Sequence, residues 1–144
     1  MIKKVFIAVV VLIAIGAIAA WFIFTEKYAN TITKNADFIV NDIGFIKEFA
    51  QNDSVANKKY AEKIITVNGI VSEIEPVDSI VNIKMIDTIT DAFINFTFQE
   101  ASVVEAKLLK KGDTVSIKGS CSGGAYSEIL ETIFITFKRC ALNK

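Results

Sequence analysis

The sequence predicts a mainly β protein with helices, in which a five-stranded barrel follows an N-terminal transmembrane helix and an amphipathic helix. Three observations lead to this prediction. Residues 5–24 contain no charged side chain, apolar residues recur at helical spacing over residues 37–50, and apolar residues alternate with polar ones from Ile64 onward. The first pattern is typical of membrane helices, the second of amphipathic helices and the third of strands.

The uncharged run at residues 5–24 predicts a helix that crosses a membrane. As a helix it extends about 30 Å, which is the thickness of the hydrocarbon core of a bilayer. Lys3 and Lys4 precede the run, so the positive-inside tendency keeps the N-terminus in the cytoplasm. We therefore predict a single-pass protein of the bacterial inner membrane whose C-terminal domain is periplasmic or extracellular.

A cleaved signal peptide is the alternative interpretation of the same run. The triplet Ala17-Ile18-Ala19 resembles the small-residue site that signal peptidases accept. The run stays apolar beyond this triplet, however, and Trp21 suits the aromatic belt at a membrane interface. These features favour the uncleaved anchor, and both interpretations export the rest of the chain.

Composition divides the chain into three parts. Residues 1–24 are the anchor or signal sequence, residues 25–36 are a polar stalk, and residues 37–144 are one domain, with its barrel at about residues 64–144. A domain of this length can bury a core of its own.

Two helical segments are expected at the start of this domain. The first has apolar residues at i, i+4, i+7 and i+11, which form one stripe of a helix: Ile39, Ile43, Ile46 and Ala50. A second short helix follows over residues 53–60, because Asn52 or Asp53 can cap its first turn.

The period then falls to two, which predicts strands. The expected strands are residues 64–75, 80–86, 92–98, 115–121 and 129–140, with a helix at residues 100–109 and a loop at Gly123-Gly124. Three strands, a helix and two strands is the order of the OB-fold, a five-stranded Greek-key barrel. Gly69, in the middle of the first strand, favours this curved barrel over an antiparallel meander.

The same region carries a family resemblance. It lies in Ala56, Tyr60, Lys63, Val67, Gly69, Val71, the LKKGD sequence at residues 109–113, the KGSCSG sequence at residues 118–123, and Cys140. In these residues the chain resembles the tRNA-anticodon-like OB-fold family (tRNA_anti-like) of small exported bacterial proteins. The resemblance implies an OB barrel preceded by a helix, an exported location and no enzymatic activity. Residues 125–139 are longer than the closing segment of the family, which leaves the register of the last strand open.

Composition limits the chemistry that the domain can perform. The chain has no histidine, which removes the commonest general base and metal ligand. Without Lys3 and Lys4, 14 cationic residues stand against 16 acidic ones, and this balance argues against nucleic acid as the partner. Calcium-loop spacing is absent from the acidic residues. We therefore expect no enzyme, no cofactor and no metal.

Cys121 and Cys140 are the only cysteines. In an exported domain two cysteines on neighbouring strands are candidates for a disulfide, which would stabilise the domain by about 3 kcal/mol. The alternative is a pair of buried free thiols.

Three residues are candidates for binding a ligand on the barrel. Phe93 is expected on the outer side of its strand, with Asn95 and Thr97, whereas Phe96 and Phe98 point inward. Lys84 and Lys118 can line a groove beside it. OB-folds bind ligands through such a face.

The sequence favours a non-catalytic, membrane-anchored envelope protein whose barrel binds a protein or a small envelope ligand. The protein would contact the membrane through residues 5–24. The alternative is binding of single-stranded nucleic acid or oligosaccharide by the barrel face.

Overall fold

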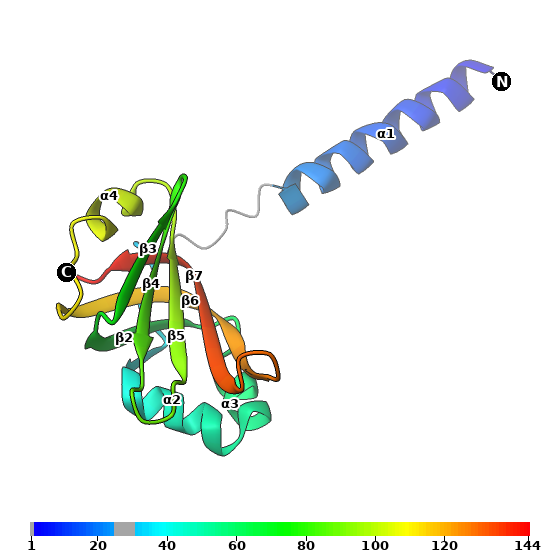
Figure 1. Ribbon diagram of the computed structural model, residues 1–144. Helices are drawn as coiled ribbons and strands as arrows, with labels where there is room; N and C mark the ends of the chain where they lie inside the picture. The colour runs from blue at the N-terminus through cyan, green and yellow to red at the C-terminus, as the bar shows by residue number, and fades with distance from the viewer. Residues whose placement is uncertain (1, 25–30) are drawn as a thin grey trace. The chain divides into compact units, whose positions relative to one another are not determined.

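A computed structural model describes residues 2–24 and 31–144, and within the first helix it describes the side chains from Phe6 to Trp21 (Figure 1). The chain forms two compact units, Met1–Asn30 and Thr31–Lys144. Residues 25–30 of the predicted stalk lie outside the described residues. Thr31, which also belongs to that stalk, is buried in the second unit.

The first unit contains the helix α1 (Ile2–Phe24). Among the residues that the structure describes, no helix meets the length and hydropathy needed to cross a membrane. The anchor predicted at residues 5–24 is therefore not confirmed.

The second unit starts with a strand that the sequence pattern did not predict. Its first elements are β1 (Phe38–Asn41), α2 (Asp42–Gln51) and α3 (Asp53–Tyr60). Residues 38–41 are extended because they pair in parallel with residues 65–68. The amphipathic helix thus begins at Asp42, where the side chain of Asn41 accepts a hydrogen bond from the Gly44 N–H at 2.6 Å. Asn52 caps α3 in the same way.

Seven strands form one sheet in the order β1-β2-β6-β7-β5-β4-β3. After β1 they are β2 (Ile64–Ile70), β3 (Glu73–Val77), β4 (Ile80–Ile86), β5 (Phe93–Phe98), β6 (Thr114–Ser127) and β7 (Thr132–Leu142). Only residues 71–72 separate β2 from β3, although the two strands lie near opposite ends of the order. The sheet therefore curls back on itself and surrounds a common interior (Figure 1).

The connections between strands exclude a plain meander. β5 pairs with β7 in parallel, and β2 pairs with β6, which follows it after three other strands. The helix α4 (Ser102–Ala106) lies between β5 and β6, so the predicted order of elements is present. In Figure 1, α2 and α3 lie at one end of the curled sheet and α4 at the other.

The prediction of five strands was wrong, because the sheet has seven. The first predicted strand shows the reason. Residues 64–75 divide at Val71 and Ser72 into β2 and β3. Val71 bonds to the backbone of Gly112 and Asp113, beside β6, whereas the Ser72 N–H bonds to the Lys84 carbonyl of β4. One bent stretch of chain thus pairs with two different neighbours, and β1 adds the seventh strand.

The predicted loop at Gly123-Gly124 was also wrong. β6 continues through both glycines to Ser127, and the turn lies at residues 128–131. A register shift between Cys121 and Gly123 absorbs the irregularity, with Gly123 at φ 101°. The helix predicted at residues 100–109 is shorter than expected, at Ser102–Ala106.

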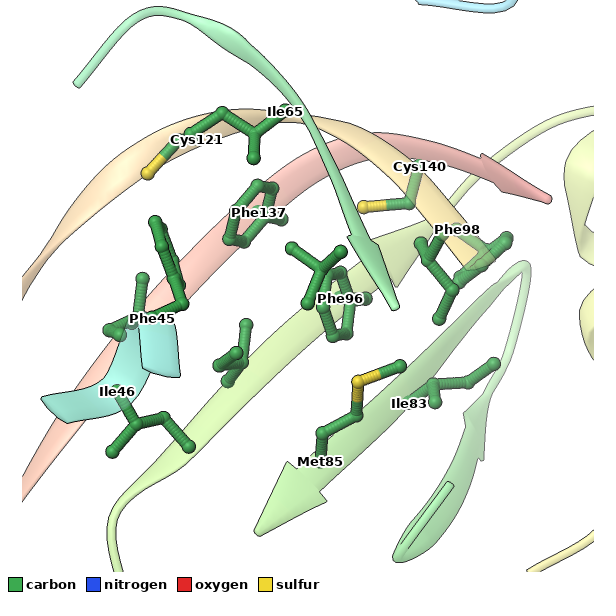
Figure 2. Close-up of a cluster of buried hydrophobic side chains, with 14 of the residues drawn as sticks. Phe45, Ile46, Ile65, Ile83, Met85, Phe96, Phe98, Cys121, Phe137 and Cys140 are labelled. Carbon is green, nitrogen blue, oxygen red and sulfur yellow. The ribbon is translucent and has the colours of Figure 1, made fainter. Parts of the chain in front are cut away.

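Alternate residues of the curled strands form the core. In β4 and β5, one side is buried and the other half-exposed at every second position, as the sequence predicted for Phe96 and Phe98. Figure 2 shows these two rings with Phe137 of β7, Met85 and Ile83 of β4, and Phe45 of α2 directed into one cluster. The opposite, half-exposed side of these strands is the surface available to a ligand.

Candidate ligand-binding face of the barrel

The outward side chains of β3, β4, β5 and β7 form one surface, which we call the outer face. Register places these residues beside one another across the strands. The outer face includes Glu73, Glu75, Asn82, Lys84, Ile86, Phe93, Asn95, Thr97, Phe134, Thr136 and Lys138.

Two of the three predicted ligand-binding residues meet on this face. The ammonium of Lys84 lies 5.7 Å from the centre of the Phe93 ring, within the range of a cation–π contact. On β7, Phe134 pairs with Phe93 in the register, and their ring centroids are 6.3 Å apart with an interplanar angle of 27°. Lys84, Phe93 and Phe134 therefore form a row across three strands.

The charge of Lys84 is shared with two carboxylates. Its Nζ atom lies 2.6 Å from Glu75 Oε1 and 3.4 Å from Glu73 Oε2, both on β3. The hydrogen bond with Glu75 raises the pKa of Lys84 above its usual value. This lysine is cationic at neutral pH, and its ammonium is already held by acidic neighbours.

Several uncharged polar side chains lie on the rest of the face, together with Lys138 and with Ile86 beside Phe93 in the register. Thr97 donates a hydrogen bond from Oγ1 to Asn82 Oδ1 at 2.9 Å. Asn95, between Lys84 and Thr136 in the register, has a buried side-chain oxygen with no hydrogen-bond partner. Amides and hydroxyls of this kind can both donate to and accept from a polar ligand.

Lys118 lies elsewhere. Its Nζ atom donates to the carbonyls of Ile32 and Lys34, both at 3.0 Å, and so fastens residues 32–34 to β6. It also lines an open pocket of about 380 Å³ with α4 and the last residues of the chain, where Lys144 forms an ion pair with Glu105. Lys118 thus lies outside the outer face and contacts residues 32–34.

The KGSCSG sequence at residues 118–123 lies within β6 and packs closely against β7 and α3. Gly119 lies against Cys140 and Phe137, and Gly123 lies against the side chain of Asn57 on α3. The Asn57 amide donates to the Gly124 carbonyl at 2.7 Å and accepts from the Gly124 N–H at 2.9 Å. Close packing against β7 at Gly119 and against α3 at Gly123 explains the two glycines of this segment.

Both cysteines are buried free thiols in this structure. The register places Cys121 opposite Phe137, while Cys140 lies beside Gly119. The two cysteines are therefore not direct cross-strand partners, and the structure does not contain the predicted disulfide. Burial raises the pKa of the Cys121 thiol to about 11 and raises the pKa of the Cys140 thiol still further above its usual value.

Thiol labelling distinguishes these free thiols from a bridge. We expect iodoacetamide at pH about 8 to modify neither cysteine in the folded protein, because burial removes both access and the reactive thiolate. In urea without a reducing agent, mass spectrometry should find both modified. A sample treated with dithiothreitol is the control, and modification only in that sample would show that the cysteines are bridged.

No cluster of three or more His, Cys, Asp or Glu side chains suited to a metal exists among the residues that the structure describes.

The outer face combines two aromatic rings, amides, hydroxyls and paired charges. This arrangement can hold a ligand by stacking and hydrogen bonding.

A barrel with this strand order, and with an aromatic and polar outer face, is the architecture of OB-fold binding modules. The chain matches the tRNA_anti-like family over residues 1–132, and it belongs to that family. A search of curated proteins gave no match.

A solved structure shares the fold. The chain is similar to a "putative nucleic acid-binding lipoprotein" from Klebsiella pneumoniae, with a TM-score of 0.58 and 20% identity over 73% of this chain and 91% of that one. It is also similar to a "putative aspartyl-tRNA synthetase" from Leishmania major, with a TM-score of 0.47 and 10% identity over 82% of this chain but only 22% of that one. At 20% identity, the similarity to the Klebsiella protein shows the fold alone.

Sequence reasoning missed Phe134 and the two glutamates that hold Lys84. Alternation along residues 132–138 could have placed Phe134 outward, with Thr136. Its position beside Phe93 could not be predicted, because the parallel pairing of β5 with β7 joins residues 41 positions apart.

Proposed function

We propose that this protein is a non-catalytic binding module of the bacterial envelope, and that its outer face holds an unpaired nucleic-acid strand or an oligosaccharide chain. The row formed by Lys84, Phe93 and Phe134 carries the proposal. Its two rings, with Ile86 beside Phe93, give apolar area on a largely polar surface, at the strands through which OB-folds hold such polymers.

The surroundings of the row support a polymer that lies across the strands. Asn82, Asn95 and Thr97 continue the face beyond Phe93, so successive units of one chain can meet first an aromatic ring and then polar groups. Stacking of one flat unit on an aromatic ring is worth about 1–3 kcal/mol. Affinity for the polymer would be the sum of several modest contacts.

One comparison supports the nucleic-acid member of this pair of ligands. The Klebsiella protein, which shares the fold, is named a "putative nucleic acid-binding lipoprotein". Lipoproteins belong to the cell envelope, so this name also supports an envelope location. This similarity favours a polymer over the protein or small envelope ligand that the sequence favoured, whereas the single-pass topology stays a prediction.

The test is binding of two polymers to three forms of the full chain. The probes are an oligothymidylate of about 12 nucleotides and chitohexaose, and the forms are the wild type, Phe134→Ala and Leu108→Ala. Leu108 is an exposed apolar residue just beyond α4, away from the outer face, and serves as the matched control.

We expect one probe to bind the wild type and Leu108→Ala equally. Phe134→Ala should weaken that binding by about tenfold or more, as removal of a stacking ring does. Isothermal titration calorimetry gives the dissociation constants. Failure of both probes to bind the wild type, or equal binding by Phe134→Ala, would overturn the proposal.

A further inference from the structure

The electrostatics of the outer face distinguish between the two polymers. Resting on the function proposed above, we infer that the ligand is an uncharged oligosaccharide and not a nucleic acid. The observation is that the lysines of the face are paired with carboxylates and that further carboxylates flank the aromatic row.

A nucleic-acid strand needs cations that are free to contact its phosphates, since these contacts supply most of the non-specific affinity. Lys84 is the cation nearest to the rings, and Glu73 and Glu75 both hold its ammonium. A phosphate that contacted Lys84 would lie close to the carboxylates of Glu73 and Glu75. Its negative charge would be repelled by theirs.

The second lysine of the face is in a similar position. Lys138 Nζ lies 3.8 Å from Glu62 Oε1. Arg139 lies beside Lys138 in the register shift opposite Thr97, so the glutamates Glu62, Glu73 and Glu75 balance three cations. The outer face with its ion-pair partners therefore has no excess of positive charge.

The two turns beside the aromatic row add acidic groups. Phe93 follows the turn at residues 87–92, and Phe134 follows the turn at residues 128–131. Thr132 donates from Oγ1 to the Thr90 carbonyl at 3.2 Å, which joins the two turns at one end of the barrel. Three acidic side chains are exposed on these turns: Asp91, Glu128 and Glu131.

The same groups suit a sugar chain. Hydroxyls of a sugar donate to carboxylates and exchange hydrogen bonds with amides and hydroxyls, and Asn82 and Thr97 carry such groups on this face. The C–H faces of pyranose rings are apolar and can pack on Phe93 and Phe134. An uncharged sugar also experiences no electrostatic repulsion from the surrounding carboxylates.

The experiment compares chitohexaose with the same oligothymidylate on the wild-type chain at about 50 mM and about 200 mM salt. We expect chitohexaose to bind with an affinity that changes less than about twofold between the two salt concentrations. At the lower salt concentration, we expect the oligothymidylate to bind at least about tenfold more weakly than chitohexaose.

A charge variant, Glu73→Gln with Glu75→Gln, makes the test independent of absolute affinity. For a sugar ligand we expect unchanged or weaker binding of chitohexaose, because the amides replace carboxylate acceptors. Tighter binding of the oligothymidylate to the wild type than of chitohexaose would overturn the inference but support the proposed function. Binding of neither probe would overturn both.

Discussion

Replacing Phe137 with alanine is expected to lower the free energy of unfolding by about 3–5 kcal/mol, the usual effect of removing a phenyl ring from a packed core. Phe137 is 1% exposed, and its ring centroid lies 5.0 Å from that of Phe96 and 5.8 Å from that of Phe45. It thereby joins β7 to β5 and to the helix α2. Urea unfolding of the full chain, followed by far-ultraviolet circular dichroism, measures the change.

Phe134→Ala is the matched control, because it makes the same chemical change three residues earlier on the same strand. Phe134 is half-exposed on the outer face, so we expect a loss below about 1.5 kcal/mol. An equal loss for the two variants would contradict the assignment of Phe134 to the surface and of Phe137 to the core.

Replacing Gly119 is expected to have the second large effect. A β carbon at Gly119 would lie 2.8 Å from Cys140 Sγ and 3.1 Å from Phe137 Cδ1, both on β7 and both buried. Valine adds two further methyl groups, so we expect Gly119→Val to destabilise the domain by about 3 kcal/mol through overpacking. The same urea unfolding experiment measures the effect.

Two comparisons show whether the close contact with β7 causes this loss. Gly119→Ala should be less destabilising in a Cys140→Ala background than in the wild type, since that background removes the nearest atom. Gly69→Val should have the smaller effect of the two valine substitutions, because the obstructing atoms at Gly69 are the carboxylate of the half-exposed Asp42 and the sulfur of Met85, an unbranched side chain that can adapt. Additive effects of Gly119→Ala and Cys140→Ala would contradict this explanation.

The site was predicted in part. Alternation alone placed Phe93, Asn95 and Thr97 outward and Phe96 and Phe98 inward, and the structure agrees. The partners of these residues come from other strands: Phe134 from β7, and Glu73 and Glu75 from β3. The sequence therefore identified one ring of the row but not the second ring or the carboxylates that hold Lys84.

Cys121 shows the same limit. Its burial could be expected from alternation with Val115 and Ile117 along the strand. Its cross-strand partner depends on two register shifts between β6 and β7, after Lys118 and after Cys121. A shift of one residue changes which side chains face each other, and nothing in the local pattern of either strand records it.

The sequence by itself determined the order of the elements, the buried and exposed sides of β4 and β5, and membership of an OB-fold family. These follow from apolar periodicity and short motifs, which are local properties of the chain. Only the tertiary structure decided that residues 38–41 are a strand, that the first predicted strand divides at Val71 and Ser72, and that Lys84 lies between two glutamates and an aromatic ring. These depend on which strands pair and in which register, because hydrogen bonds and packing between distant segments, rather than local preference, select the pairing that buries the core.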